Sequence, residues 1–344
     1  MFEAIVTLCL AGAPDICRET LLPGIAGTEA ASCEAGLPAA YAPPAGLVAA
    51  SAPACRTAPA PLPFTEVAPG LYVHRGVVAE PDAANGGDVA NIGFVVGREA
   101  VAVIDAGTTR GVAEGVWRAI RTRTDLPVRH LILTHVHPDH TLGAPLFVEA
   151  GAEVVGHAAL DRALADRQAN YLESMAALIG RGAMIGSGAV ATDIAVATTH
   201  TLDLGGRMLD LRAWPLAHTG TDLTVMDRQT GTLLAGDLIF DDHVPALDGS
   251  LRGWQGALDV LAAMQLANVV PGHGGPRLEW PGGAEPMRRY LDTLARDTTE
   301  AIAAGERMAA AVEWIAASES AHWALFDAYN ARNATVAFTE LEWE

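Results

Sequence analysis

One short segment constrains what this chain can fold into more than any other, because it places metal-binding side chains directly after a strand. The apolar run 131–133 predicts a buried strand. Three histidines and one aspartate follow within the next seven residues: His135, His137, Asp139 and His140. In extended backbone, residues two apart point to the same side, so the first two histidines can face one cation. Pro138 interrupts regular structure there, and we expect the next helix to open at Thr141.

Three more side chains stand in the same position relative to apolar runs: His218, Asp237 and His273. Gly236 and Gly272 precede two of them and let the backbone turn tightly. A single histidine or aspartate at a strand end is usually structural. Four such clusters in one chain predict that the strands of a common sheet deliver metal ligands to one edge, since unpaired polar groups are not buried without partners.

Composition places the chain among globular proteins and argues against a nucleic-acid substrate. Half of the 344 residues are apolar and 18% are charged, so the chain can bury one large core or two. All 22 basic residues are arginine, and the formal net charge is −19. Binding of polyanions needs clustered basic residues, which this balance disfavours. No apolar run is long enough for a membrane span.

All four cysteines fall within the first 55 residues: Cys9, Cys17, Cys33 and Cys55. An even number in a Pro- and Ala-rich segment predicts two disulfides, with three pairings open, and hence a periplasmic or secreted protein. The alternative is four reduced thiols in a cytosolic protein. The apolar stretch Ala4–Ala13 has no basic residue before it, so we interpret it as a strand or short helix rather than a signal peptide.

The sequence predicts two regions and an α/β (α+β) architecture. Residues 1–63 form a Cys-containing segment that ends in a proline-rich linker over 39–63, and residues 64–344 form one domain with C-terminal helices. Strands are predicted at 71–73, 92–96, 101–105, 131–133, 209–211, 223–226 and 233–235. Helices are predicted at 111–123 and 160–179 and through much of 286–329. Strand runs interleaved with helices predict layered packing.

The pattern H-x-H-x-D-H, followed by a strand-end His, a Gly-Asp and a Gly-His, is similar to the metallo-β-lactamase superfamily over residues 64–275. The resemblance implies an αββα sandwich with metals at one end of its two sheets. It implies a first metal on His135, His137 and His218, a second on Asp139, His140 and His273, and Asp237 bridging both. Flavodiiron relatives have a glutamate where this chain has His137, so zinc is expected, two per chain.

This likeness also implies a mechanism. Two cations that share a water lower its pKa toward neutrality and yield a hydroxide, which attacks a small ester, lactone, lactam or thioester. Asp139 is the expected catalytic residue, orienting that hydroxide and shuttling its proton.

The whole chain further resembles the quinoprotein relay system zinc metallohydrolases, a SoxH-like branch. The matching features are C-R-E at 17–19, L-P-G at 22–24, G-D-V-A-N-I-G at 87–93, H-P-D-H at 137–140 and the tail E-L-E-W-E. This resemblance implies a periplasmic hydrolase working near quinoprotein dehydrogenases.

Other functions share the ligand pattern. A β-lactam hydrolase needs a groove that binds a small carboxylate. A glyoxalase II-like thioesterase needs a basic patch on the C-terminal helices, for which Arg288, Arg289 and Arg296 are available. A mono-iron dioxygenase uses the same scaffold with fewer ligands, and a non-catalytic metal-binding module is the remaining alternative.

Two residues outside the ligand set are candidates for substrate contact. His243 lies just after Asp237 in sequence and can line the mouth of the site, and Asn91 lies in a glycine-rich segment that can overhang the sheet edge. The helix predicted at 160–179, followed by four glycines, is either a lid or ordinary packing.

Overall fold

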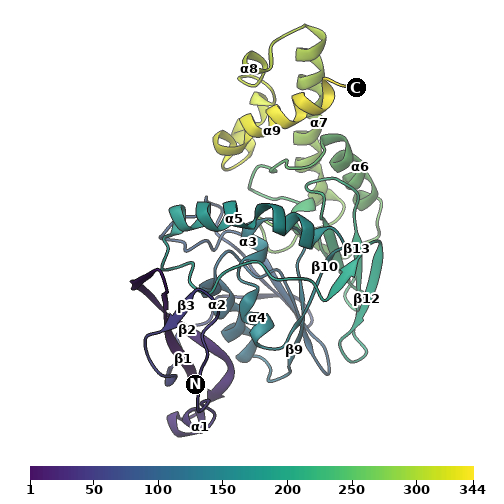
Figure 1. Cartoon of the computed structure of the whole chain (residues 1–344). Coiled ribbons are helices and arrows are strands. Elements are labelled where there is room, and N and C mark those ends of the chain that lie inside the picture. Colours follow the sequence, from purple (N-terminus) through teal and green to yellow (C-terminus); the bar gives the residue numbers. More distant parts are fainter.

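The computed structural model describes all residues from 1 to 344 and contains three sheets (Figure 1). The largest has seven strands in the order β11-β10-β9-β8-β7-β6-β5. Its strands are β5 (Thr65–Ala68), β6 (Leu71–His74), β7 (Ile92–Val96), β8 (Val101–Ile104), β9 (Val128–Ile132), β10 (Glu153–His157) and β11 (Ile194–Val196). The second sheet has five strands in chain order: β12 (Thr199–Asp203), β13 (Met208–Ala213), β14 (Leu223–Asp227), β15 (Thr232–Leu234) and β16 (Asn268–Val270).

The two larger sheets pack face to face, and helices cover both outer faces. Strand β8 shows why, because its apolar side chains alternate between two cores. Ala102 and Ile104 pack between the sheets against residues such as Leu211 and Val225. Val101 and Val103 point to the opposite face of the sheet and pack under the helices. Burial on both faces explains the unbroken apolar runs in the sequence. This αββα arrangement is the predicted fold, and the prediction is confirmed.

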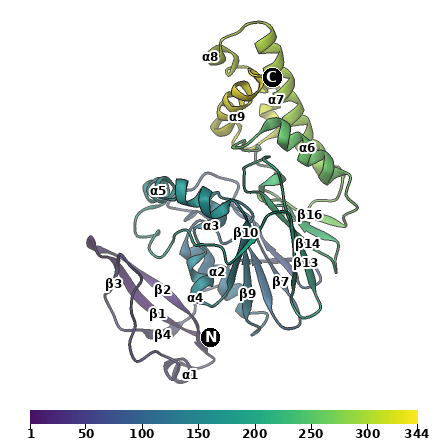
Figure 2. The same ribbon diagram turned by 45° about the vertical axis from the view of Figure 1, so that its right-hand side comes forward.

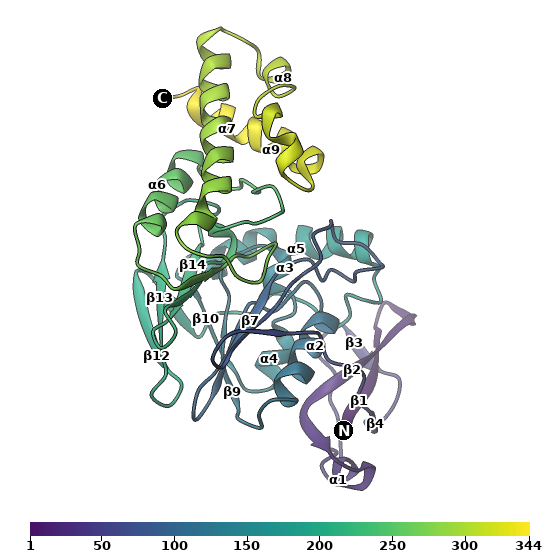
Figure 3. The ribbon, with the colours of Figure 1, turned by 180° about the vertical axis from the view of Figure 1, so that it is seen from behind.

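Helices α2 (Arg110–Arg121), α4 (Pro145–Glu149) and α5 (Leu160–Ile179) lie along the seven-stranded sheet. Helices α6 (Leu251–Ala262) and α7 (Glu285–Ala303) cover the other sheet, and α7 extends well beyond it (Figure 3). The Thr109 side chain caps α2 and the Ser250 side chain caps α6, each accepting a backbone N–H from the first turn. The C-terminal region adds α8 (Met308–Ala311) and α9 (Phe326–Leu341), so helicity extends past the predicted limit.

The N-terminal region folds as a small sheet with its own core. Its elements are β1 (Phe2–Leu10), β2 (Ala13–Gly27), α1 (Ala30–Glu34), β3 (Leu47–Ala49) and β4 (Ala54–Thr57). Both β3 and β4 pair with β1. They lie within the stretch 39–63 that its prolines indicate as a linker, and the prolines flank the paired residues. Disulfides join Cys9 to Cys17 and Cys33 to Cys55, as two disulfides were predicted.

Ion pairs attach this N-terminal sheet to helix α2. Glu3 accepts hydrogen bonds from the Arg118 guanidinium at 2.7 and 3.0 Å, and Arg18 pairs with Glu114 at 2.6 Å. Glu3 and Glu114 are both buried. Figure 2 shows that the N-terminal sheet and the C-terminal helices lie at opposite ends of the molecule. No helix is both long and apolar enough to cross a bilayer.

Candidate metal centre

The strand before the ligand segment begins three residues earlier and ends one residue earlier than the apolar run 131–133 predicts. Strand β9 ends at Ile132, so His135 lies in a loop rather than in extended strand backbone. Helix α3 (Pro138–Thr141) then begins at the proline, with His137 as its N-cap residue. The expectation of a helix opening at Thr141 is therefore wrong, because proline lacks only an N–H that the first helical position does not use. The loop and the single helical turn still direct all four side chains toward one place.

The three remaining side chains arrive from the five-stranded sheet. His218 lies in the loop between β13 and β14, Asp237 lies in the short 3-10 helix Gly236–Leu238 after β15, and His273 follows β16. Gly272 is required for space rather than for a turn, since an added Cβ would lie 1.8 Å from an Asp237 carboxylate oxygen. The strand ends of both sheets thus meet at one edge of the sandwich.

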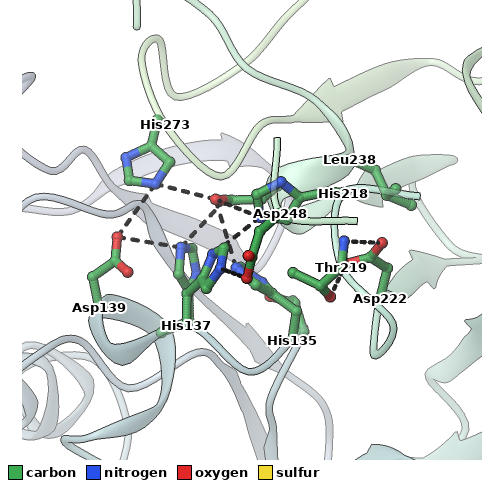
Figure 4. Close-up of polar contacts among 12 residues, drawn as sticks. His135, His137, Asp139, His218, Thr219, Asp222, Leu238, Asp248 and His273 are labelled. Atoms are coloured by element: carbon green, nitrogen blue, oxygen red, sulfur yellow. Dashed lines mark hydrogen bonds and ion pairs between the residues drawn. The ribbon is translucent and has the colours of Figure 1, made fainter. Parts of the chain in front are cut away.

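These seven predicted residues form two groups of possible metal ligands. The first is His135, His137, His218 and Asp237, and the second is Asp139, His140 and His273. Within each group the ligand atoms lie within 4.8 Å of one another. Figure 4 shows His135, His137 and His218 of the first group close to Asp139 and His273 of the second, and the Asp237 carboxylate lies within 3.6 Å of histidines of both groups. Its oxygens are 3.6 Å from His135 Nε2, 3.5 Å from His218 Nε2, 3.2 Å from His140 Nε2 and 3.4 Å from His273 Nε2.

The orientation of the rings fits a cation rather than a closed hydrogen-bond network. Three histidines direct their outer nitrogen at an oxygen that can only accept: His137 at Asp248 (3.0 Å), His140 at Asp105 (2.8 Å) and His273 at the Val89 carbonyl (2.9 Å). Donation there leaves the inner nitrogens free to bind a metal. The buried Nε2 atoms of His135 and His140, and one Asp237 oxygen, lack any hydrogen-bond partner in the protein. Such buried orphans are expected where an ion binds.

Two carboxylates that support the ligands, buried Asp105 and half-buried Asp248, have no counterpart in the sequence motif. Asp105 directly follows β8 with a positive φ of 65° and accepts hydrogen bonds from the Thr134 N–H and hydroxyl at 2.8 and 2.9 Å. The same carboxylate holds His140, so the strained backbone serves a ligand. Asp248 holds His137 and is itself paired with Arg167 from α5. Neither residue is signalled by spacing, because their contacts arise only in the folded chain.

Burial and mutual charge shift the pKa values within the cluster in opposite directions. Burial acts to lower the pKa of His273, but the Asp237 and Asp139 carboxylates outweigh it and raise this pKa to about 9. Burial lowers the pKa of His218 to about 3, and neighbouring His137 acts in the same sense. Binding of a cation needs neutral imidazole, so it must displace a proton from His273.

A cavity of about 320 Å³ opens onto the cluster. Its floor carries the ligand residues His137, Asp139, Asp237 and His273, and its wall carries side chains of α5 and α9 such as Tyr171, Met175, Tyr329 and Arg332. The helix predicted at 160–179 therefore borders the site. His243 also lines the cavity, with Nδ1 2.6 Å from the Val244 carbonyl, and burial lowers its pKa to about 4.

Other candidate residues lie elsewhere. Asn91 does not line the cavity; its side chain donates to the Pro271 carbonyl at 2.9 Å and accepts from the Gly76 N–H at 3.2 Å. The three arginines that were candidates for a basic patch do not line the cavity. Each forms an ion pair elsewhere: Arg288 with Asp259, Arg289 with Glu319 and Arg296 with Asp297. They are surface and structural charges.

Comparison with known families gives a match over more than half of the chain. The family model described as Metallo-beta-lactamase superfamily matches residues 85–273, which are 189 of the 344 residues. No curated protein matches the sequence.

Several solved structures share the fold. A metallo-beta-lactamase from Pontibacter korlensis is 22% identical, with a TM-score of 0.55 over 67% of this chain and 99% of the other. FIM-1 from Pseudomonas aeruginosa, in its mono-zinc form, is 18% identical, with a TM-score of 0.53 over 67% of this chain and 95% of that protein. The sec-alkylsulfatase Pisa1 from Pseudomonas sp. is 16% identical, with a TM-score of 0.60 over 80% and 49%. At these identities the similarity is one of fold.

Proposed function

Because this chain belongs to the metallo-β-lactamase superfamily, we propose that it is a binuclear zinc hydrolase of small esters, lactones, lactams or thioesters. The arrangement of six ligand-type side chains around the buried Asp237 carboxylate carries this proposal. His135, His137 and His218 would hold the first cation, Asp139, His140 and His273 the second, and Asp237 would contact both. Histidine and carboxylate donors suit zinc. Two complete groups favour this assignment over a mono-iron dioxygenase.

When bound, the cations would supply Lewis-acid polarisation of the scissile carbonyl and lower the pKa of a water. Side chains of the protein would orient the water, accept its proton and hold the metal ligands in place. Asp139 borders the cavity with its side chain 16% exposed, and its Oδ2 lies 3.3 Å from His273 Nε2. It is placed to orient a water against the substrate and to accept its proton. Asp105 and Asp248 keep the rings of His140 and His137 in their binding orientation.

Hydrolysis of β-lactams is the second candidate, supported by the shared fold and by an arginine on the cavity wall. We further propose that the protein is exported, since its two disulfides persist in oxidising compartments. A role beside quinoprotein dehydrogenases in the periplasm rests on the resemblance to that branch of the superfamily.

Metal analysis combined with a substrate screen tests the proposal. The purified protein should carry close to two zinc ions per chain by elemental analysis. His135→Ala or His218→Ala should remove mainly the first ion and His273→Ala mainly the second, whereas His200→Ala, on the edge strand β12, should remove none. Zinc-loaded protein should hydrolyse at least one of a panel of lactams, lactones, thioesters, phosphodiesters and sulfate esters.

One iron per chain would overturn the binuclear zinc assignment and favour a dioxygenase. Full zinc occupancy with no turnover across the panel would favour a metal-binding module.

A further inference from the structure

Helix α9 contributes two side chains to the wall of the metal-centre cavity. Tyr329 and Arg332 are one helical turn apart and both line it, while Asn330 and Asn333 on the same helix are buried in the C-terminal core. None of the seven ligand-type residues comes from α9. The helix therefore borders the cavity without taking part in the metal cluster.

Hydrogen bonds fix α9 against the segment that precedes α6. Asn333 accepts the Leu247 N–H at 2.9 Å and donates to the Pro245 carbonyl at 2.6 Å. Near the end of the helix, Glu340 accepts the Ser250 hydroxyl at 2.7 Å and the Leu251 N–H at 2.6 Å. Groups held this way lose little conformational freedom when they bind a ligand.

Tyr329 has a hydroxyl without a hydrogen-bond partner in the protein. Its ring packs edge-on against His243, with centroids 4.9 Å apart, and the side chain is half-buried. Burial raises the pKa of Tyr329 well above its usual value, so the hydroxyl remains a donor at all physiological pH values. The Tyr329 side chain lines the cavity, so its hydroxyl is available to donate to a ligand bound there.

Arg332 is the only arginine among the cavity-lining residues, which include no lysine. Its one ion pair is a 3.3 Å contact with Asp248 Oδ1, and its side chain is 62% exposed. Asp248 is already held by His137 and by Arg167. A guanidinium has five N–H donors, so most of those on Arg332 are free to bind a ligand.

The charge balance of the cavity supports an anionic ligand. Asp139 and Asp237 belong to the metal cluster, and Arg167 offsets Asp248. Exposed Glu80 is the one acidic side chain of the lining left without such a role. Arg332, with a single 3.3 Å ion pair and most of its donors unused, is therefore the one positive charge that this lining offers to a ligand, in a chain with net charge −19.

We propose that Tyr329 and Arg332 form a carboxylate-binding subsite, so that the substrate carries a carboxylate in addition to the bond that is hydrolysed. The planar guanidinium fork matches a carboxylate, and the phenol adds a third donor. Apolar side chains that line the same cavity, including Met175 and Leu247, would contact the carbon chain of the substrate. This inference rests on the proposed hydrolase function and specifies its substrate class.

Two 4-nitrophenyl esters test the subsite, one with a free carboxylate and one with that carboxylate methylated: mono-4-nitrophenyl glutarate and its methyl ester. The wild type should prefer the acid. Arg332→Gln should lower the ratio of the two kcat/KM values about 10–100-fold, chiefly by raising KM for the acid, as expected on loss of a charged hydrogen bond. Tyr329→Phe should lower the ratio about 3–10-fold. The ratio cancels any effect that Arg332 exerts on both esters through Asp248.

Two further variants control the result. Arg288→Gln removes an arginine of the same C-terminal helices that pairs with Asp259 outside the cavity, and it should leave the ratio unchanged. Glu80→Gln should increase the ratio, because it removes the opposing charge. An equal rate for both esters in the wild type, or an unchanged ratio in Arg332→Gln, would overturn the subsite.

Binding separates failure of the subsite from failure of the hydrolase proposal. If neither ester is hydrolysed, calorimetric titration with glutaric acid monoanilide and its methyl ester replaces kinetics. Preferential binding of the acid that is lost in Arg332→Gln supports the subsite even then. Binding of the acid that persists in Arg332→Gln places the carboxylate on the metal cluster instead and contradicts the inference.

Discussion

At the scale of single residues, two aspartates of the metal centre have different surroundings. Asp237 is buried and lies within 3.6 Å of four imidazoles, so its charge offsets whatever cations the cluster holds. Asp139 contacts only His140 and His273 and borders the cavity. One aspartate is placed to hold metals together, and the other is placed to meet a substrate.

Substitution by asparagine should separate these roles. Asp139→Asn should keep the fold and at least the first metal but lower kcat roughly 10²–10⁴-fold, because an amide cannot accept the proton. Asp237→Asn should weaken binding of both metals, since a neutral group no longer offsets two dications. Elemental analysis and steady-state kinetics on any hydrolysed substrate measure both effects. Full activity in Asp139→Asn with two metals bound would exclude the proposed role of Asp139.

The sequence predicted the ligand-type residues that the fold gathers but not the residues that orient them. His135 and His218 could be recognised because side chains at strand ends follow a readable pattern. Asp105 could not, since its importance lies in a positive φ and in contacts to residues 29 and 35 positions away. Arg332 could not, because nothing in sequence tells which turn of a C-terminal helix borders a cavity.

At the scale of elements, helix α5 joins the metal-centre cavity to the N-terminal sheet. Its residues Tyr171 and Met175 line the cavity. On another side, Leu172 lines a groove shared with Leu10 and Leu47 of the N-terminal sheet. The loop that follows α5 inserts buried Ile185 into the core of that sheet. The wall of the cavity is therefore supported from the disulfide-containing region.

Removal of the Ile185 side chain should loosen α5. Ile185→Ala should destabilise the protein by about 2–4 kcal/mol, the usual result of truncating a buried aliphatic side chain. Hydrogen exchange along 160–179 should become faster, and KM should rise for substrates that contact this wall. Val148→Ala, at an exposed position on α4, is the control. Unchanged exchange in α5, despite lost stability, would show that the two regions are uncoupled.

Element boundaries followed from periodicity wherever burial is regular. Helix α5 and strand β7 have the predicted limits, because both bury apolar residues at helical or strand spacing. The 15-residue strand β2 was not predicted, since it contains Pro14, Pro23 and a positive-φ Gly24. Pairing with β1 and the Cys9–Cys17 disulfide hold it extended, and both are long-range constraints.

At the scale of the whole molecule, the charge state of the cluster couples metal binding to folding. The pKa of His273 is raised to about 9, whereas an unfolded histidine titrates near 6.5. The metal-free native state therefore holds a proton that the unfolded chain releases. Its contribution to stability is complete below about pH 6.5 and is lost as pH rises toward 9. The pKa of His218 is lowered to about 3, so its titration affects stability only at pH values below the range from 6.5 to 9.

We therefore expect the metal-free protein to lose stability between pH 6.5 and 9, on the order of 2 kcal/mol. Urea unfolding with a chelator present measures the loss. Zinc should abolish this dependence, because it replaces the proton on His273 and binds the native state alone. His273→Ala without metal should reduce the slope. A flat profile in the metal-free wild type would contradict the coupling.

The helices that close the cavity supply none of the seven ligand-type residues, and this separation has an evolutionary consequence. Mutations in the ligand loops would be purged by selection in any descendant that keeps the chemistry. Mutations at positions such as Tyr329 and Arg332 would be tested only against the current substrate. Lineages of this protein should therefore diverge in substrate preference before they diverge in the reaction that they catalyse. The sequence of α9 should change along with that preference.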